Sequence, residues 1–195
     1  MRSHRALFAS VLILLASTAF LAGAEKTASI EQLTAFAANM QSGQAGVIEI
    51  AIERWSTEAE RDMLLEALQE GGEDALLKAL EKIRPPVGYM RTPNSIGWDL
   101  YYARQIRQPD GGRKIILATN RRVNIREAVN NTRSMQYQFT LIEIHLDKNG
   151  KGEGKMVPAA KVSWDAKQKR IEVENYSALP VDLVNVKSTK STKKS

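Results

Sequence analysis

The chain has 195 residues, with 28 lysines and arginines, 22 acidic residues and no cysteine. Without cysteine it has no disulfide, no thiolate metal site and no cysteine nucleophile. The formal charge of +6 comes from the two ends of the chain, because residues 25–186 carry as many basic as acidic side chains. Within that part, an acidic block at 49–74 and a basic block at 104–133 either form two faces of the molecule or neutralise each other.

Residues 1–24 have the pattern of a secretory signal peptide. Arg2 and Arg5 give a basic start, residues 6–22 are uncharged and mostly apolar, and small residues at 22–24 form a cleavage site. The alternative is a retained membrane anchor, for which the apolar run is short. We predict cleavage after residue 24 and an exported protein, periplasmic or extracellular, from a bacterium. We expect no nucleic-acid partner and no transmembrane span after processing.

Strand and helix signals alternate in the first half of the mature chain. Residues 33–40 fit a strand or a short helix, and residues 47–55 alternate apolar and polar side chains, which is typical of a half-buried strand. Thr57 and Glu60 have the spacing of a capping box. Two apolar stripes follow, separated by a Gly-Gly pair and ended by two prolines. These signals predict a helical hairpin at 57–83, set between strands.

From residue 96 onward the chain has the pattern of short strands joined by tight turns. Together with the hairpin, this predicts an α+β fold that is mainly antiparallel β, a meander barrel or sandwich of about 7–9 strands. We expect a single domain over residues 25–186. Residues 187–195 lack apolar side chains, which predicts a disordered basic tail that contacts anionic surfaces or only aids solubility. The expected strands cover 96–107, 113–119, 134–146, 156–164, 171–174 and 179–186.

The apolar side chains of the expected strand at 134–146 change parity. They occupy the odd positions up to Leu141 and the even positions from Ile142. Because side chains in a strand alternate between faces, such a change requires a bulge or a bend. We therefore predict one near residues 140–142.

Glu143, His145 and Asp147 form the first candidate site. His145 is the one histidine left after processing, and the three side chains share a strand face at i, i+2 and i+4. This spacing suits a metal or a general base with its orienting carboxylate. A solvated outer strand face is the favoured interpretation, because the outer faces of strands are normally polar, so we predict no metal site. No glycine-rich phosphate loop or Gly-x-Ser-x-Gly motif is present, and we predict no cofactor.

Trp98, Tyr102 and Arg104 form the second candidate site, for a ligand. Alternation puts all three on one face of the strand at 96–107. An arginine pointing into a barrel must be paired or must contact a ligand. In the alternative, the aromatic rings belong to the core and the arginine extends outward at the strand end.

Four segments resemble a family of uncharacterised exported bacterial proteins. They are the runs at 52–61, 97–104, 109–112 and 139–144. The resemblance covers roughly residues 47–186. It implies export and a bacterial source, and it implies no activity, cofactor or site residue.

Three functions are compatible with these patterns. The favoured one is a non-enzymatic exported β-rich module that binds an unknown small ligand or an envelope protein, with the ligand at the barrel mouth. The second is a hydrolase of envelope material that uses carboxylates and His145. The third is a structural component of an envelope assembly, with the acidic helical hairpin as its docking face.

Overall fold

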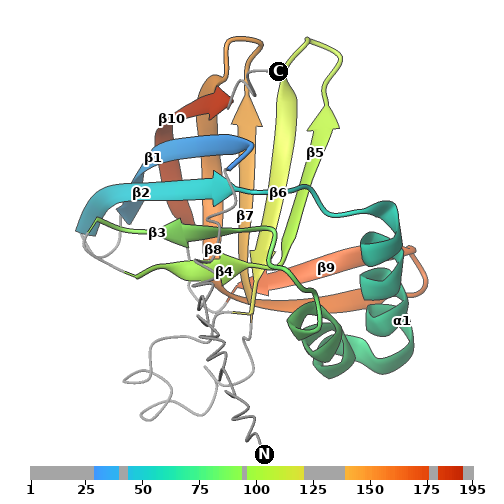
Figure 1. The fold of residues 1–195 in the computed structure, drawn as a ribbon. Helices are drawn as coiled ribbons and strands as arrows, with labels where there is room; N and C mark the ends of the chain where they lie inside the picture. Colours follow the sequence, from blue (N-terminus) through green and yellow to red (C-terminus); the bar gives the residue numbers. More distant parts are fainter. Residues whose placement is uncertain (1–28, 40–43, 94–95, 121–138, 176–179, 191–195) are drawn as a thin grey trace, which may run out of the picture.

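A computed structural model describes residues 29–39, 44–93, 96–120, 139–175 and 180–190. The predicted signal peptide lies outside these residues. The described part is mainly antiparallel β sheet with one helix (Figure 1). No helix in it is both long and apolar enough to span a membrane. In chain order the elements are β1 (Glu31–Asn39), β2 (Gln44–Ile52), α1 (Glu58–Glu81), β3 (Gly88–Arg91), β4 (Trp98–Leu100), β5 (Tyr102–Arg107), β6 (Arg113–Thr119), β7 (Phe139–Leu146), β8 (Lys151–Asp165), β9 (Arg170–Asn175) and β10 (Val181–Lys190).

The sheet is a nearly closed barrel. Its strand order is β4-β3-β2-β1-β10-β8-β7-β6-β5, and β9 pairs with β8 outside this path. The two ends of the path approach each other, because the Tyr101 N–H between β4 and β5 donates to the Ala118 carbonyl of β6 at 3.0 Å. The Thr119 hydroxyl also donates to the Asp99 carbonyl at 2.6 Å. The prediction of a mainly antiparallel fold is confirmed, in the barrel form and not the sandwich form.

Apolar side chains from the strands of the path fill the barrel. Alternation on β2, for example, turns Ile48, Ile50 and Ile52 inward, with exposed fractions of 5%, 1% and 0%. Equivalent inward residues from the other strands complete one continuous cluster. A ligand inside the barrel would have to displace this core, so the expected site at the barrel mouth receives no support.

A buried ion pair lies inside the barrel. Glu31 of β1 is 2% exposed, and Arg113 of β6 donates to both of its carboxylate oxygens, at 2.8 Å for the Nη1–Oε2 contact. Ser188 of β10 also donates to Glu31. Because β10, β8 and β7 separate β1 from β6 in the sheet, the pair joins strands that share no backbone hydrogen bonds.

Helix α1 differs from the predicted hairpin. It begins at the predicted capping box, in which Thr57 Oγ1 accepts from the Glu60 N–H at 3.1 Å and the Thr57 N–H donates to Glu60 at 2.8 Å. At Gly72 the backbone leaves the helical region (φ 67°, ψ −155°), and the helix then continues to its end. It therefore consists of two helical segments joined by a break at Gly72, and the predicted hairpin of two antiparallel helices is not shown. The reason is that the leucines of both halves pack on the outside of the barrel, in a second core with Phe139 and Val162.

This second core also explains the parity change in β7. Phe139 is 1% exposed and packs toward α1, whereas Ile142 and Ile144 belong to the barrel interior. The strand does not change faces; both of its faces are covered at this level. A register irregularity between β7 and β8 does occur at the predicted place, between Phe139 and Leu141, but the extra residue is in β8.

The predicted strand at 96–107 is two strands. Leu100 and Ala103 both point into the barrel core. They are three residues apart, whereas side chains on one face of a regular strand are an even number of residues apart, so the alternation of faces is interrupted between them. Tyr101 occupies the break and packs in the second core. The predicted face shared by Trp98 and Tyr102 is therefore wrong, because β4 and β5 have opposite parity.

The predicted disordered tail begins too early. Residues 187–190 continue β10 and pair with β1, from Thr34↔Lys187 to Glu31↔Lys190. Backbone pairing needs no apolar side chain, and the Ser188 hydroxyl is held by the buried ion pair. Residues 191–195 lie outside the described part of the chain.

Candidate functional site: an apolar groove beside the helix

A cavity of about 600 Å³ lies between α1, the outer face of β5–β8 and strand β9. We call it the α1 groove. Leucines of the helix form one wall, and apolar side chains of the barrel exterior form its floor. The principal apolar lining residues are Leu64, Leu68, Leu76, Tyr102, Leu141 and Val157.

The far wall of the groove is an arm formed by β8 and β9. The register between β7 and β8 shifts near Pro158, and residues 160–165 of β8 then pair with β9. In Figure 1 this part of β8 and β9 run to the side of the barrel where α1 lies. Ile171 and Val173 of β9 line the groove and are still 52% and 49% exposed. Large apolar side chains left half exposed around a concavity are typical of a binding surface.

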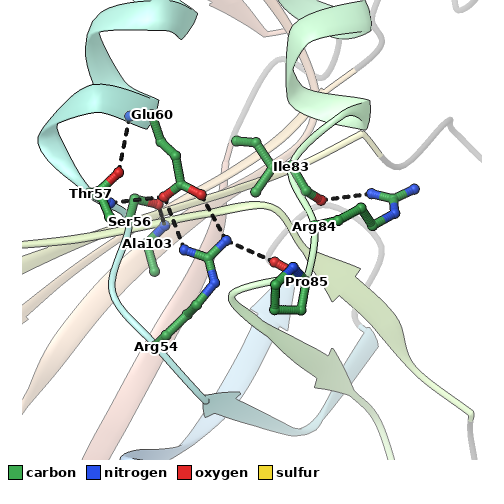
Figure 2. A network of polar contacts seen from close by, with 8 residues as sticks. All are labelled: Arg54, Ser56, Thr57, Glu60, Ile83, Arg84, Pro85 and Ala103. Atoms are coloured by element: carbon green, nitrogen blue, oxygen red, sulfur yellow. Dashed lines mark hydrogen bonds and ion pairs between the residues drawn. The ribbon is translucent and has the colours of Figure 1, made fainter.

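The near wall is fixed by a polar cluster at the start of α1 (Figure 2). Arg54, just after β2, donates to both carboxylate oxygens of Glu60 at 2.9 and 2.8 Å and to the Pro85 carbonyl at 2.8 Å. The hydrogen bond from Arg54 lowers the pKa of Glu60. Ser56 accepts from the Ala103 N–H of β5 at 3.0 Å. These contacts hold the first turn of the helix against the barrel.

The strand register places side chains in rows across the floor of the groove, and neighbouring rows differ in charge. One row across β5, β6, β7 and β8 is apolar, and consists of Tyr102, Ala118, Leu141 and Val157. The next row, two residues further along each strand, is largely charged, and consists of Arg104, Ile116, Glu143 and Lys155. The floor of the groove therefore passes from an apolar row to a charged row, and Ile106 of β5 lines the groove beyond Arg104. We call the charged row and the side chains around it the polar end of the groove.

Three cationic side chains and one carboxylate stand at the polar end. The cations are Arg61, Arg104 and Lys155, and the carboxylate is Glu143. Arg104 Nη2 lies 3.5 Å from Oε1 of Glu58, a helix side chain that is 72% exposed. The acidic and basic blocks of the sequence thus meet at α1. The part of the basic block at 121–133 lies outside the described residues.

The structure places two of the three predicted ligand-binding residues in this groove. Tyr102 and Arg104 line it, from the outside of the barrel and not from the inside. Trp98 packs against the barrel core instead. Sequence reasoning missed the helix leucines and the β9 arm. The available signal was the alternation of Ile171 and Val173 with acidic residues, which places both apolar side chains on one face of the strand.

The structure brings together two of the three predicted catalytic residues. His145 Nε2 and Glu143 Oε1 are 2.7 Å apart and both side chains are about half exposed, at 55% and 48%. Burial raises the pKa of Glu143, but hydrogen bonds and charges from His145 and Lys114 outweigh it, and the pKa lies below its ordinary value. These contacts form an exposed polar cluster, of which Glu143 lines the groove.

Asp147 has a separate role in the turn between β7 and β8. Its Oδ1 accepts from the backbone N–H groups of Asn149 and Lys151 at 2.8 and 2.9 Å. The hydrogen bond from Lys151 lowers the pKa of Asp147. Within the described residues, no three His, Cys, Asp or Glu side chains are grouped so that they could hold a metal ion.

Comparison with protein families, with curated proteins and with solved structures finds no match. The resemblance to exported bacterial proteins therefore stays a prediction, and the groove carries the functional argument by itself.

Proposed function

We propose that this protein is an exported, non-enzymatic binding module that holds a small apolar ligand in the α1 groove. The observation that carries the proposal is a concavity of about 600 Å³ lined mostly by leucine, isoleucine and valine. Ligand sites typically have volumes of about 300–1,000 Å³ with apolar walls and a few polar groups. The α1 groove has this size and this composition.

Two features separate the groove from ordinary core. Ile171 and Val173 keep about half of their surface exposed although both face other apolar side chains. The arm that carries them pairs with the rest of the sheet along β8 alone. An apolar ligand would remove this surface from water at about 25 cal/mol per Å².

The binding test uses a neutral apolar fluorophore, N-phenyl-1-naphthylamine, titrated into the purified protein. We expect saturable binding with a blue-shifted emission. Val173→Lys places a charge in the groove at an already exposed position, and we expect it to weaken binding by about tenfold or more. Val47→Lys is the matched control, because Val47 is also an exposed strand valine (42%) and is not among the residues that line the groove. Equal binding by the two variants, or no saturable binding by the wild type, contradicts the proposal.

The hydrolase interpretation retains one contact, the exposed pair of Glu143 and His145. The third member of the predicted set, Asp147, is engaged in a turn. We therefore favour binding over hydrolysis. Turnover of an envelope substrate that disappears in His145→Ala would reverse this preference.

A further inference from the structure

We propose that the ligand of the α1 groove is an anionic single-chain amphiphile, a fatty-acid carboxylate whose head binds at Arg104 and Lys155 and whose chain lies on the apolar floor. This rests on the proposed function and adds the class and the orientation of the ligand.

The first support is the order of the two rows on the barrel exterior. The apolar row of Tyr102, Ala118, Leu141 and Val157 lies directly beside the row that contains Arg104 and Lys155. Helix leucines and the β9 arm cover the apolar side of the groove. A ligand that follows this surface must be apolar along most of its length and polar at one end.

The second support is the sign of the charge at the polar end. With the charged groups that contact them included, the cations at this end are Arg61, Arg104, Lys155 and Lys114, and the carboxylates are Glu58, Asp62 and Glu143. Arg61 lies 2.9 Å from Asp62, Arg104 lies 3.5 Å from Glu58, and Lys114 lies 3.5 Å from Glu143. The surplus at this end is cationic. It favours an anionic head over a neutral or cationic one.

The third support is the state of Arg104 itself. Its side chain is 34% exposed, and its contact with Glu58 is a single 3.5 Å approach to a carboxylate that is 72% exposed. Exposed pairs of this kind contribute little stability. The guanidinium is therefore available to a ligand carboxylate, with which it can form the stronger two-point contact. Nearby, Ile106 and Tyr102 extend the same strand face along the groove.

The test compares compounds that have the same alkyl chain and different heads. Dodecanoate, dodecanol and dodecylamine are used to displace N-phenyl-1-naphthylamine from the purified protein at neutral pH. We expect dodecanoate to bind about tenfold or more tightly than dodecanol, and dodecylamine to bind most weakly. Shortening the carboxylate should weaken binding by about fourfold for each methylene removed.

Arg104→Gln identifies the head-group contact. We expect it to abolish the preference for dodecanoate over dodecanol, measured as the ratio of the two dissociation constants in the same variant, so that any general change in the affinity of the groove cancels. Arg107→Gln is the matched control on the same strand, since Arg107 is exposed and is not among the residues that line the groove. Its preference should equal that of the wild type.

The outcomes separate the two proposals. If dodecanoate and dodecanol bind equally while the fluorophore still binds in the groove, the amphiphile proposal is wrong and the binding-module proposal stands. If Arg104→Gln keeps the full preference, the assignment of the head-group site is wrong. If neither the fluorophore nor any alkyl compound binds, both proposals fail.

Discussion

The ion pair inside the barrel gives the sharpest prediction about stability. Glu31 and Arg113 have side-chain exposures of 3% and 12%, and Ser188 completes the contact to the carboxylate. Removing one partner leaves a charge that the barrel still buries. Breaking such a pair costs about 3–5 kcal/mol, a large part of the roughly 5–15 kcal/mol that stabilises a domain.

We expect Glu31→Leu and Arg113→Met each to lose about 3–5 kcal/mol of unfolding free energy. In a domain of this size, that corresponds to a melting temperature lower by about 6–20 °C. The double variant should lose far less than the sum, because two apolar side chains of similar length leave no buried charge and often match a buried ion pair in stability.

Urea denaturation followed by tryptophan fluorescence and far-ultraviolet circular dichroism measures all four forms of this double-mutant cycle. The control is Arg170→Gln, which breaks an exposed pair with Glu172 (58% and 48% exposed) and should cost about 1 kcal/mol or less. The reasoning is refuted if the single variants resemble this control, or if their losses add up in the double variant.

Three further predictions concern the helix, the barrel and the arm. Thr57→Ala removes the hydroxyl of the capping box and should cost about 1 kcal/mol in urea denaturation; an unchanged midpoint would show that the cap contributes nothing. Gly152→Ala should cost about 2 kcal/mol or more, because a Cβ there would lie 1.8 Å from a carbonyl oxygen of β7. Gly46→Ala, with no atom within 4 Å of the added carbon, should be nearly neutral. Burial raises the pKa of Glu73, although the Val162 N–H donates to it at 3.3 Å. The folded state therefore holds this proton more tightly, and the stability that Glu73 contributes falls as pH rises from its ordinary pKa through its raised one. Glu73→Gln should remove this loss, so the melting temperature of the variant relative to that of the wild type should be higher at neutral pH than at acidic pH. Melting temperatures of the variant and the wild type that depend identically on pH from about pH 4 to about pH 8 would contradict this.

The sequence predicts elements well where one physical signal acts alone. The isoleucines of β2 alternate because one face of the strand meets the core. The start of α1 follows from the reciprocal bonds of Thr57 and Glu60. The interruption follows from Gly72, which adopts a positive φ that is strained for other residues.

The predictions fail where tertiary partners change the meaning of a local pattern. The apolar side chain of Phe139 predicted a bulge in the strand, because the alternation argument assumes that only one face of a strand meets a core. In this molecule two cores cover the two faces of β7. Residues 187–190 were predicted to be disordered because they lack apolar side chains. They form part of β10, because β1 supplies backbone hydrogen-bond partners that do not depend on side chains.

The candidate site was predicted only in part for the same reason. Arg104 and Tyr102 were predicted to face the barrel interior, and the reset of the alternation at Tyr101 turns them to the outside of the barrel, where they line the groove. The far wall of the groove is formed by β9. The position of β9 near α1 depends on the irregularity in β8, and no local sequence pattern predicts that position.

The pairing of β1 with β10 means that the sheet stays incomplete until the last described strand has been made. The first described strand finds one of its two neighbours in the last one, with Glu31 opposite Lys190. A nascent chain that has not yet delivered β10 leaves unpaired edges on both β1 and β8, and such edges recruit other chains. Truncated chains that end before residue 181 should therefore aggregate and should not form smaller soluble folds.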